Sequence, residues 1–175
     1  MSLSDLAAIG SFISGLAVVF SFIFLALQMR QANLNQKSLM QQGRSARTVD
    51  LLMKMTDPIL SETIMRAFQG GKAMNPAQNF AFYGFAAAIF WNYEDSFLQF
   101  QSKTLDAKSW ESDVATLKGL LRNPAYRAAW RAARDGIGEG YRDFVDSLML
   151  EVKGAAPRAV AELLGQYMTE EMAKI

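Results

Sequence analysis

Four carboxylates in the middle of the sequence are the side chains best suited to acid–base or metal chemistry. Glu94 and Asp95 are adjacent, and Glu111 and Asp113 follow beyond the next turn. Paired carboxylates can transfer protons or bind hard cations. Adjacent residues on a helix diverge by about 100°, so Glu94 and Asp95 cannot both face one site. We therefore expect these groups to cap helices, to face solvent or to pair with Lys or Arg.

The composition removes most other catalytic chemistry. The 175 residues include no Cys and no His, which excludes thiolate nucleophiles, zinc-finger ligands and imidazole bases. Carboxylate-bridged di-iron sites in helical bundles also need His. The sequence contains neither a phosphate-binding loop nor a nucleophile-elbow motif. We expect no enzyme, no cofactor and no metal site.

Three arginines form a second candidate site. Arg127, Arg131 and Arg134 share one side of a predicted helix and could contact anionic lipid head groups or an acidic partner. The alternative is that they form the solvated side of an amphipathic helix. The net charge of the whole chain is only +1, so we expect no nucleic-acid partner.

The first structural element predicted along the chain is a long apolar helix. Residues 6–29 carry no charge, and as a helix they would extend roughly 36 Å at 1.5 Å per residue, enough to cross a membrane. A buried helix of a water-soluble protein is the first alternative, but such helices are seldom apolar on every side. A cleaved signal peptide is the second, but residues 1–5 hold no basic residue. We expect a transmembrane anchor over residues 1–29.

Small residues mark one side of this predicted span. Ala7, Ser11 and Gly15 recur at intervals of four, and Ser14 lies beside them. Small side chains let two membrane helices approach closely, and hydroxyl groups can form hydrogen bonds across the contact. We expect a helix–helix docking surface at Ala7, Ser11, Ser14 and Gly15, although small residues are also ordinary in membrane helices.

Basic residues follow the span. Within residues 30–55, Asp50 is the single acidic residue, against five basic ones: Arg30, Lys37, Arg44, Arg47 and Lys54. Positive charge accumulates on the cytoplasmic side of membrane proteins, so the N-terminus is predicted to be periplasmic and the rest cytoplasmic. Residues 30–55 are predicted to continue the helix as a stalk, whose Arg30, Lys37, Arg44 and Arg47 could contact lipid head groups.

Residues 56–175 read as a cytoplasmic bundle of short helices. Helix starts are predicted at Asp57-Pro58, Asn75-Pro76, Asp106 or Ser109, Asn123-Pro124 and Pro157, and stops at Gly70-Gly71, Asp135-Gly136 and Gly154. The helix after Asn75 is expected to reach about Lys103 and has a wide apolar side. Its residues 76–93 carry no charge, which leaves open whether they touch or enter the bilayer. We favour a buried central helix in an all-α fold.

Several strings in the chain carry a family resemblance. They are residues 24–31, residues 94–100, Leu105-Asp106 with Trp110, Asn123-Pro124 with Trp130, and residues 141–146. The chain resembles a group of small, uncharacterised bacterial membrane proteins with one N-terminal span and a helical cytoplasmic domain. The resemblance implies the bacterial inner membrane, but no activity and no functional residues. Thr104 stands where the resemblance implies Gly.

These observations lead to one functional hypothesis and three alternatives. The chain is predicted to be a non-catalytic, membrane-anchored interaction module, an accessory or assembly subunit of a larger inner-membrane complex. The first alternative is a homo-oligomer held by the span and the stalk. The second is a protein that binds anionic lipid head groups. The third, the least favoured, is an enzyme that uses Glu94, Arg127 and Arg131.

Overall fold

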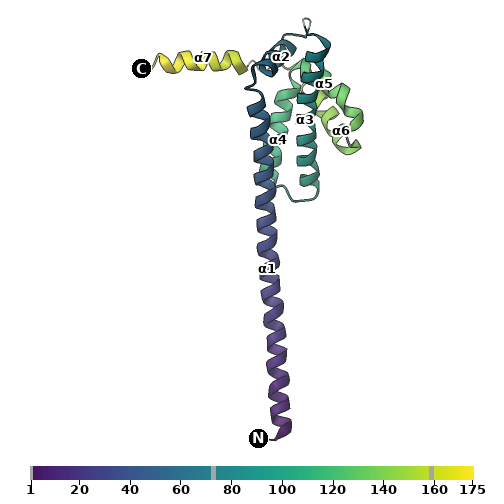
Figure 1. The fold of residues 1–175 in the computed structure, drawn as a ribbon, viewed down its shortest axis with the longest axis vertical. Helices are drawn as coiled ribbons and strands as arrows, with labels where there is room; N and C mark the ends of the chain where they lie inside the picture. The colour runs from purple at the N-terminus through teal and green to yellow at the C-terminus, as the bar shows by residue number, and fades with distance from the viewer. Residues whose placement is uncertain (1, 72–73, 158–159) are drawn as a thin grey trace. The chain divides into compact units, whose positions relative to one another are not determined.

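The computed structural model describes residues 2–71, 74–157 and 160–175, and within them all regular structure is helical. Figure 1 shows the helices. In chain order they are α1 (Leu3–Lys54), α2 (Pro58–Phe68), α3 (Pro76–Gln101), α4 (Ala107–Leu121), α5 (Pro124–Ala133), the 3-10 turn η1 (Arg134–Gly136), α6 (Glu139–Glu151) and α7 (Val160–Met172). The all-α prediction is confirmed.

The chain divides into two compact units, Met1–Ala46 and Arg47–Ile175. The first unit consists of α1, and the last two turns of that helix belong to the second. No residue of α1 is buried. Among the described helices, α1 alone is long and apolar enough, by length and composition, to cross a membrane. The stalk predicted over residues 30–55 is therefore shared between the two units.

The starts of the domain helices follow the predicted capping residues. The side chain of Asp57 accepts a hydrogen bond from the Leu60 amide at 2.9 Å and caps α2. Asn75 and Gln78 bond each other's backbone amides and form a capping box at α3. Asp106 caps α4 and Asn123 caps α5 in the same way. Each cap satisfies amides that have no partner within their own helix, which is why these polar residues begin helices.

The turns between helices use left-handed backbone, mostly at glycine. Gly70 and Gly71 after α2 and Gly154 after α6 have positive φ, as the predicted stops require. The turn after α3 differs, because its left-handed residue is Lys103 with φ 58°, one position before Thr104. The last helix is expected to start at Pro157, but residues 158–159 lie outside the described residues. α7 is described from Val160.

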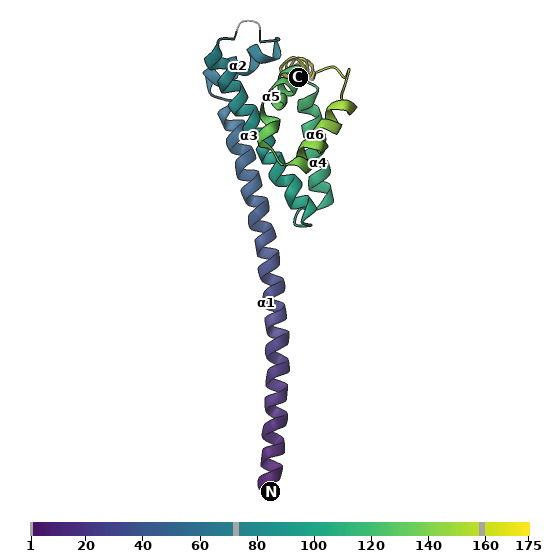
Figure 2. The same cartoon turned by 90° about the vertical axis from the view of Figure 1, so that its right-hand side faces the viewer.

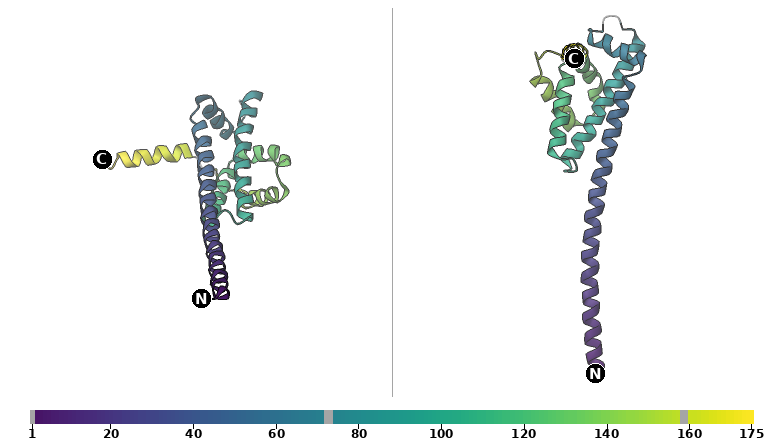
Figure 3. Two further views of the ribbon diagram at one scale, coloured as in Figure 1. Left: turned by 60° about the horizontal axis from the view of Figure 1, so that its bottom comes forward. Right: turned by 90° about the vertical axis from the view of Figure 1, so that its left-hand side faces the viewer.

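α3 is the central helix of the second unit. It contacts α2, α4 and α5, and it forms an antiparallel hairpin with α4 that can be followed in Figures 2 and 3. Ala86 and Phe90 are completely buried. The ring of Phe90 meets Trp130 of α5 edge-on, with centroids 5.0 Å apart. The prediction of a buried central helix over residues 76–93 agrees with this packing.

Trp130 joins three helices at the centre of this core. It is fully buried, and its Nε1 donates a hydrogen bond of 2.7 Å to Asp146 of α6. Its ring also meets Tyr141 at an interplanar angle of 88°. A large aromatic side chain with a satisfied polar atom is strongly stabilising when buried. The residue therefore holds α3, α5 and α6 in one arrangement.

α7 differs from the other domain helices. Its large apolar residues are exposed: Val160, Leu163, Leu164, Tyr167, Met168 and Met172. These side chains are therefore not buried by the described part of the chain.

Candidate partner-binding groove

The second unit carries an apolar groove between α2, α3 and α5. It encloses about 780 Å³, and the described residues that line it carry no formal charge: Ala67, Phe68, Gly70, Gly71, Met74, Pro76, Asn79, Phe80, Phe82, Tyr83, Pro124, Ala125, Ala128, Ala129 and Ala132. Phe80 is 75% exposed, although phenylalanine usually avoids water. An open apolar groove that ends in an exposed aromatic ring is typical of a protein-binding surface.

Alanines on one side of α5 create the hollow. Ala125, Ala128, Ala129 and Ala132 follow a spacing of three and four and project from the same side of the helix. Their side chains are too short to fill the space between α5 and α3, so the groove stays open along this side of α5. Ala128 and Ala132 are exposed, whereas Ala129 is buried. Bulky residues at these positions would close the groove.

Two aromatic rings that line the groove, Phe68 and Phe82, pack against the buried ring of Tyr126. Their ring centroids lie 5.8 and 5.7 Å from that of Tyr126. Burial, together with neighbouring Tyr93, raises the pKa of Tyr126 to about 12, so its hydroxyl stays neutral at physiological pH. The aromatic layer beneath the described lining is therefore uncharged, and the groove suits an apolar side chain from a partner.

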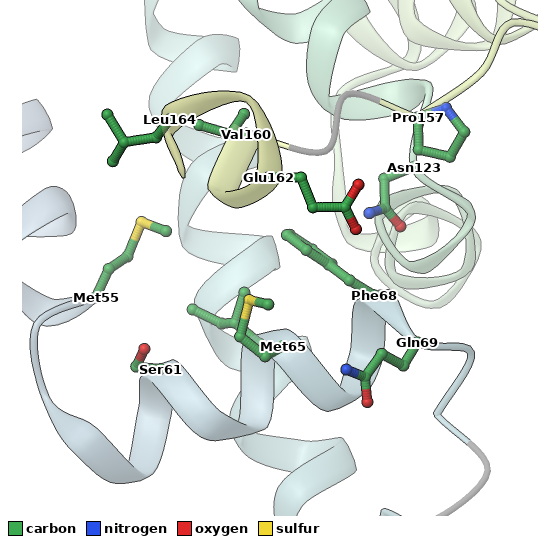
Figure 4. A pocket seen from close by; sticks show the side chains of 11 residues that line it. Met55, Ser61, Met65, Phe68, Gln69, Asn123, Pro157, Val160, Glu162 and Leu164 are labelled. Atoms are coloured by element: carbon green, nitrogen blue, oxygen red, sulfur yellow. The ribbon is translucent and has the colours of Figure 1, made fainter. Parts of the chain in front are cut away.

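Phe68 also borders a second cavity, between α2 and the start of α7 (Figure 4). This cavity encloses about 420 Å³ and is lined by Met55, Ser61, Ile64, Met65, Phe68, Gln69, Asn123, Pro157, Val160, Glu162 and Leu164. Most of the lining is apolar, and Glu162 supplies the one carboxylate. The two cavities meet at one aromatic ring, so an occupant of either would contact Phe68.

Two of the four carboxylates that could have carried chemistry, Glu94 and Asp95, have structural partners instead. Glu94 accepts a 2.8 Å hydrogen bond from the Gly138 amide at the start of α6, and a carboxylate is favourable at a helix N-terminus. Asp95 pairs with Arg47. Within the described residues, no group of three or more acidic side chains could hold a metal ion. The expected capping and pairing are thus present for Glu94 and Asp95.

The three arginines of the predicted basic stripe are not equivalent. Arg127 donates two hydrogen bonds of 2.8 Å to the carbonyls of Leu121 and Arg122 at the end of α4. Arg134 pairs with Asp146 at 2.6 Å. Arg131 is exposed and has no such partner among the described residues. Two of the three guanidinium groups are therefore engaged in holding the domain together.

Asp146 is the acceptor that organises this corner of the domain. Partial burial opposes its ionisation, but hydrogen bonds from Trp130 and Arg134 outweigh burial and hold the pKa of Asp146 below its usual value. The carboxylate therefore stays ionised at neutral pH and keeps both donors satisfied. This role is structural and links α6 to α5.

The other predicted site residues lie on α1. Ala7, Ser11, Ser14 and Gly15 are exposed, and nothing lies within 4 Å of a Cβ added to Gly15. Arg30 and Lys37 are exposed in the stalk, whereas Arg47 bonds Asn92 at 3.2 Å in addition to Asp95. Arg47 therefore fixes the end of α1 to α3.

Sequence reasoning did not predict the groove. The alanine spacing in residues 125–132 was a usable signal, because alanines at three- and four-residue intervals make a flat helix side. Whether that side is covered depends on how far α2 and α3 lie from α5, which no local pattern reveals. Comparisons of the chain with protein-family models, with curated proteins and with solved structures found no match, so the family resemblance stays a prediction.

Proposed function

We propose that this chain is a non-catalytic, membrane-anchored interaction module whose helical domain holds an apolar segment of a partner protein. The observation that carries the proposal is the apolar groove between α2, α3 and α5, whose described lining carries no charge and which has exposed Phe80 at its edge. A groove of this kind suits an amphipathic helix that inserts apolar side chains at three- and four-residue intervals.

The anchor in this proposal is the first part of α1. Its length and apolar composition satisfy the requirements of a membrane span. The excess of basic residues after residue 29 favours a periplasmic N-terminus and a cytoplasmic domain in the bacterial inner membrane. The partner would then be a larger complex of the same membrane, which this chain serves as an accessory or assembly subunit.

A substitution that fills the groove tests the proposal. Ala128 is exposed in the groove, so Ala128→Glu should leave the fold intact and place a charge where the apolar partner binds. Ala115→Glu on α4 is the matched control, because Ala115 is also exposed but lies outside the groove. The proteins that copurify with the full chain from native membranes in mild detergent are identified by mass spectrometry.

We expect at least one partner to be lost with Ala128→Glu and retained with Ala115→Glu. The proposal fails if the set of copurified proteins is the same for both variants. It also fails if the unaltered chain copurifies with no other protein.

A further inference from the structure

We infer that α1 associates with a second copy of this chain, parallel and in register, along one line of residues that runs the length of the helix. The line repeats at alternating steps of three and four residues, which is the heptad spacing of a left-handed coiled coil. It includes Gln28 at the end of the predicted span. In the stalk it consists of Ala32, Asn35, Leu39, Gln42, Ala46, Val49 and Met53. We call this line the seam.

Large apolar side chains in the stalk make the seam a surface in need of a partner. Leu39, Val49 and Met53 are 66%, 57% and 61% exposed. Exposed apolar residues at the two heptad positions of one seam, outside the predicted span, are typical of the contact side of a coiled coil. Covering them would remove this apolar surface from water.

The domain of the same chain packs on the other side of the helix. Leu51 and Met55 are partly buried against the domain core, and Arg47 pairs with Asp95. At 100° per residue, these three positions lie opposite Val49 and Met53. The seam at the end of α1 is therefore left open by its own domain.

Charge identifies the occupant as a second copy. In the stalk the basic residues Arg30, Lys37 and Arg44 fall seven residues apart, on the line opposite the seam. The positions that flank the seam in the stalk are uncharged apart from Asp50. In a parallel pair of copies, the basic residues of the two helices would therefore lie as far apart as the helices permit. An acidic partner would not need the basic residues to lie away from the contact.

Polar residues in the seam also fit a copy of themselves. Gln28, Asn35 and Gln42 occupy equivalent heptad positions, and an amide side chain carries both donors and an acceptor. In a parallel, in-register pair each amide meets its own counterpart, and such residues select register in coiled coils. The parallel direction depends on the membrane anchor of the proposed function, since two chains of one topology enter the bilayer in the same sense.

The seam continues into the predicted span, where four of its six residues before Gln28 are Ala or Ser. There it is formed by Ala7, Ser11, Ser14, Val18, Ser21 and Leu25. Bulky residues lie on the opposite line, as at Ile9, Leu16 and Ile23. Small residues permit close approach of membrane helices, so the stalk contact can extend through the bilayer without a change of register.

Disulfide trapping tests the inference directly, because the chain has no cysteine and every cross-link reports an introduced residue. Single-cysteine variants Asn35→Cys, Gln42→Cys and Val49→Cys probe the seam. Lys37→Cys and Gln41→Cys are controls on exposed positions outside it. The full-length chain is oxidised in native membranes and resolved by non-reducing electrophoresis. A disulfide needs Cβ atoms about 3.5–4.5 Å apart, so only facing positions react efficiently.

We expect a disulfide-linked pair at all three seam positions and near-complete loss of that band at the two control positions. Equal cross-linking at all five positions, or none at any, overturns the inference. Cross-linking at a single seam position indicates an antiparallel crossing and also overturns it.

A second measurement does not depend on oxidation. Leu39→Asp should convert the oligomer to a monomer in mild detergent, whereas Lys37→Asp should leave its size unchanged. A native chain that already migrates as a monomer overturns the inference. Ala128→Glu combined with Gln42→Cys should still give the disulfide-linked pair, so failure of the groove proposal and failure of the seam can be told apart.

Discussion

Two long apolar helices of this protein have similar compositions and very different surroundings. Residues 6–29 of α1 and residues 76–93 of α3 both lack charge. No residue of α1 is buried, whereas Phe82, Phe85 and Phe90 of α3 lie in the core. Apolar composition therefore does not by itself determine which solvent a helix needs. The difference comes from whether other elements supply complementary surfaces.

The hydrogen-bond partners of polar side chains on each helix show the same difference in surroundings. On α3, Asn92, Glu94 and Asp95 reach partners on other elements, namely Arg47 and the Gly138 amide. On α1, the Ser21 hydroxyl donates to the carbonyl of Ala17 in its own helix at 2.8 Å. A helix that satisfies its polar groups internally is suited to lipid, and one that depends on neighbours is suited to a folded domain.

The largest expected effect comes from removing one phenylalanine ring from α3 and, for comparison, one from α1. Phe90→Ala should lower the free energy of unfolding of the domain by about 3–5 kcal/mol, because Phe90 is fully buried against Trp130. Phe24→Ala should leave that free energy unchanged, because Phe24 is 63% exposed. All three tryptophans lie in α3, α4 and α5, so fluorescence during denaturation in mild detergent reports the domain alone. Equal losses for both variants would remove the distinction between the helices.

A charge in the predicted span should have the next largest effect. Leu16→Lys places a lysine near the middle of residues 6–29 and should weaken membrane insertion by about 2.5–3.5 kcal/mol. Gln41→Lys adds the same charge to the stalk and should have no effect. The measurement is the fraction of chain that resists alkaline extraction from membranes. Full recovery of Leu16→Lys in the membrane pellet would argue that lipid does not surround this segment.

The smallest expected effect concerns the turn between α3 and α4. Lys103 adopts φ 58°, a conformation that costs a non-glycine residue about 1 kcal/mol, so Lys103→Gly should stabilise the domain by about that amount. Lys103→Ala retains a Cβ and should give no gain. Both are measured by the same denaturation. A gain from alanine equal to that from glycine would assign the effect to the lysine side chain instead of the backbone.

Electrostatics separates residues that sequence pattern groups together. The spacing of three arginines, Arg127, Arg131 and Arg134, places them on one side of a helix. In the structure, however, Arg127 bonds the end of α4 and Arg134 bonds Asp146. The partners of Arg127 lie five and six residues earlier in the chain, and the partner of Arg134 lies twelve residues later. A helical projection could place these residues on one side, but it could not show which of them remain accessible to a partner.

The sequence by itself determined the helical class, the helix starts at Asp57, Asn75 and Asn123, and the apolar side of α3, whereas it left the start of α4 open between Asp106 and Ser109. These features depend on local physics, namely capping of free amides and the period of the helix. Only the tertiary structure decided that the alanines of α5 border an open groove, that Glu94 caps α6 and that Arg47 joins α1 to α3. Each of these depends on the distance between elements far apart in the chain, which is determined by how the whole core packs and not by any one segment.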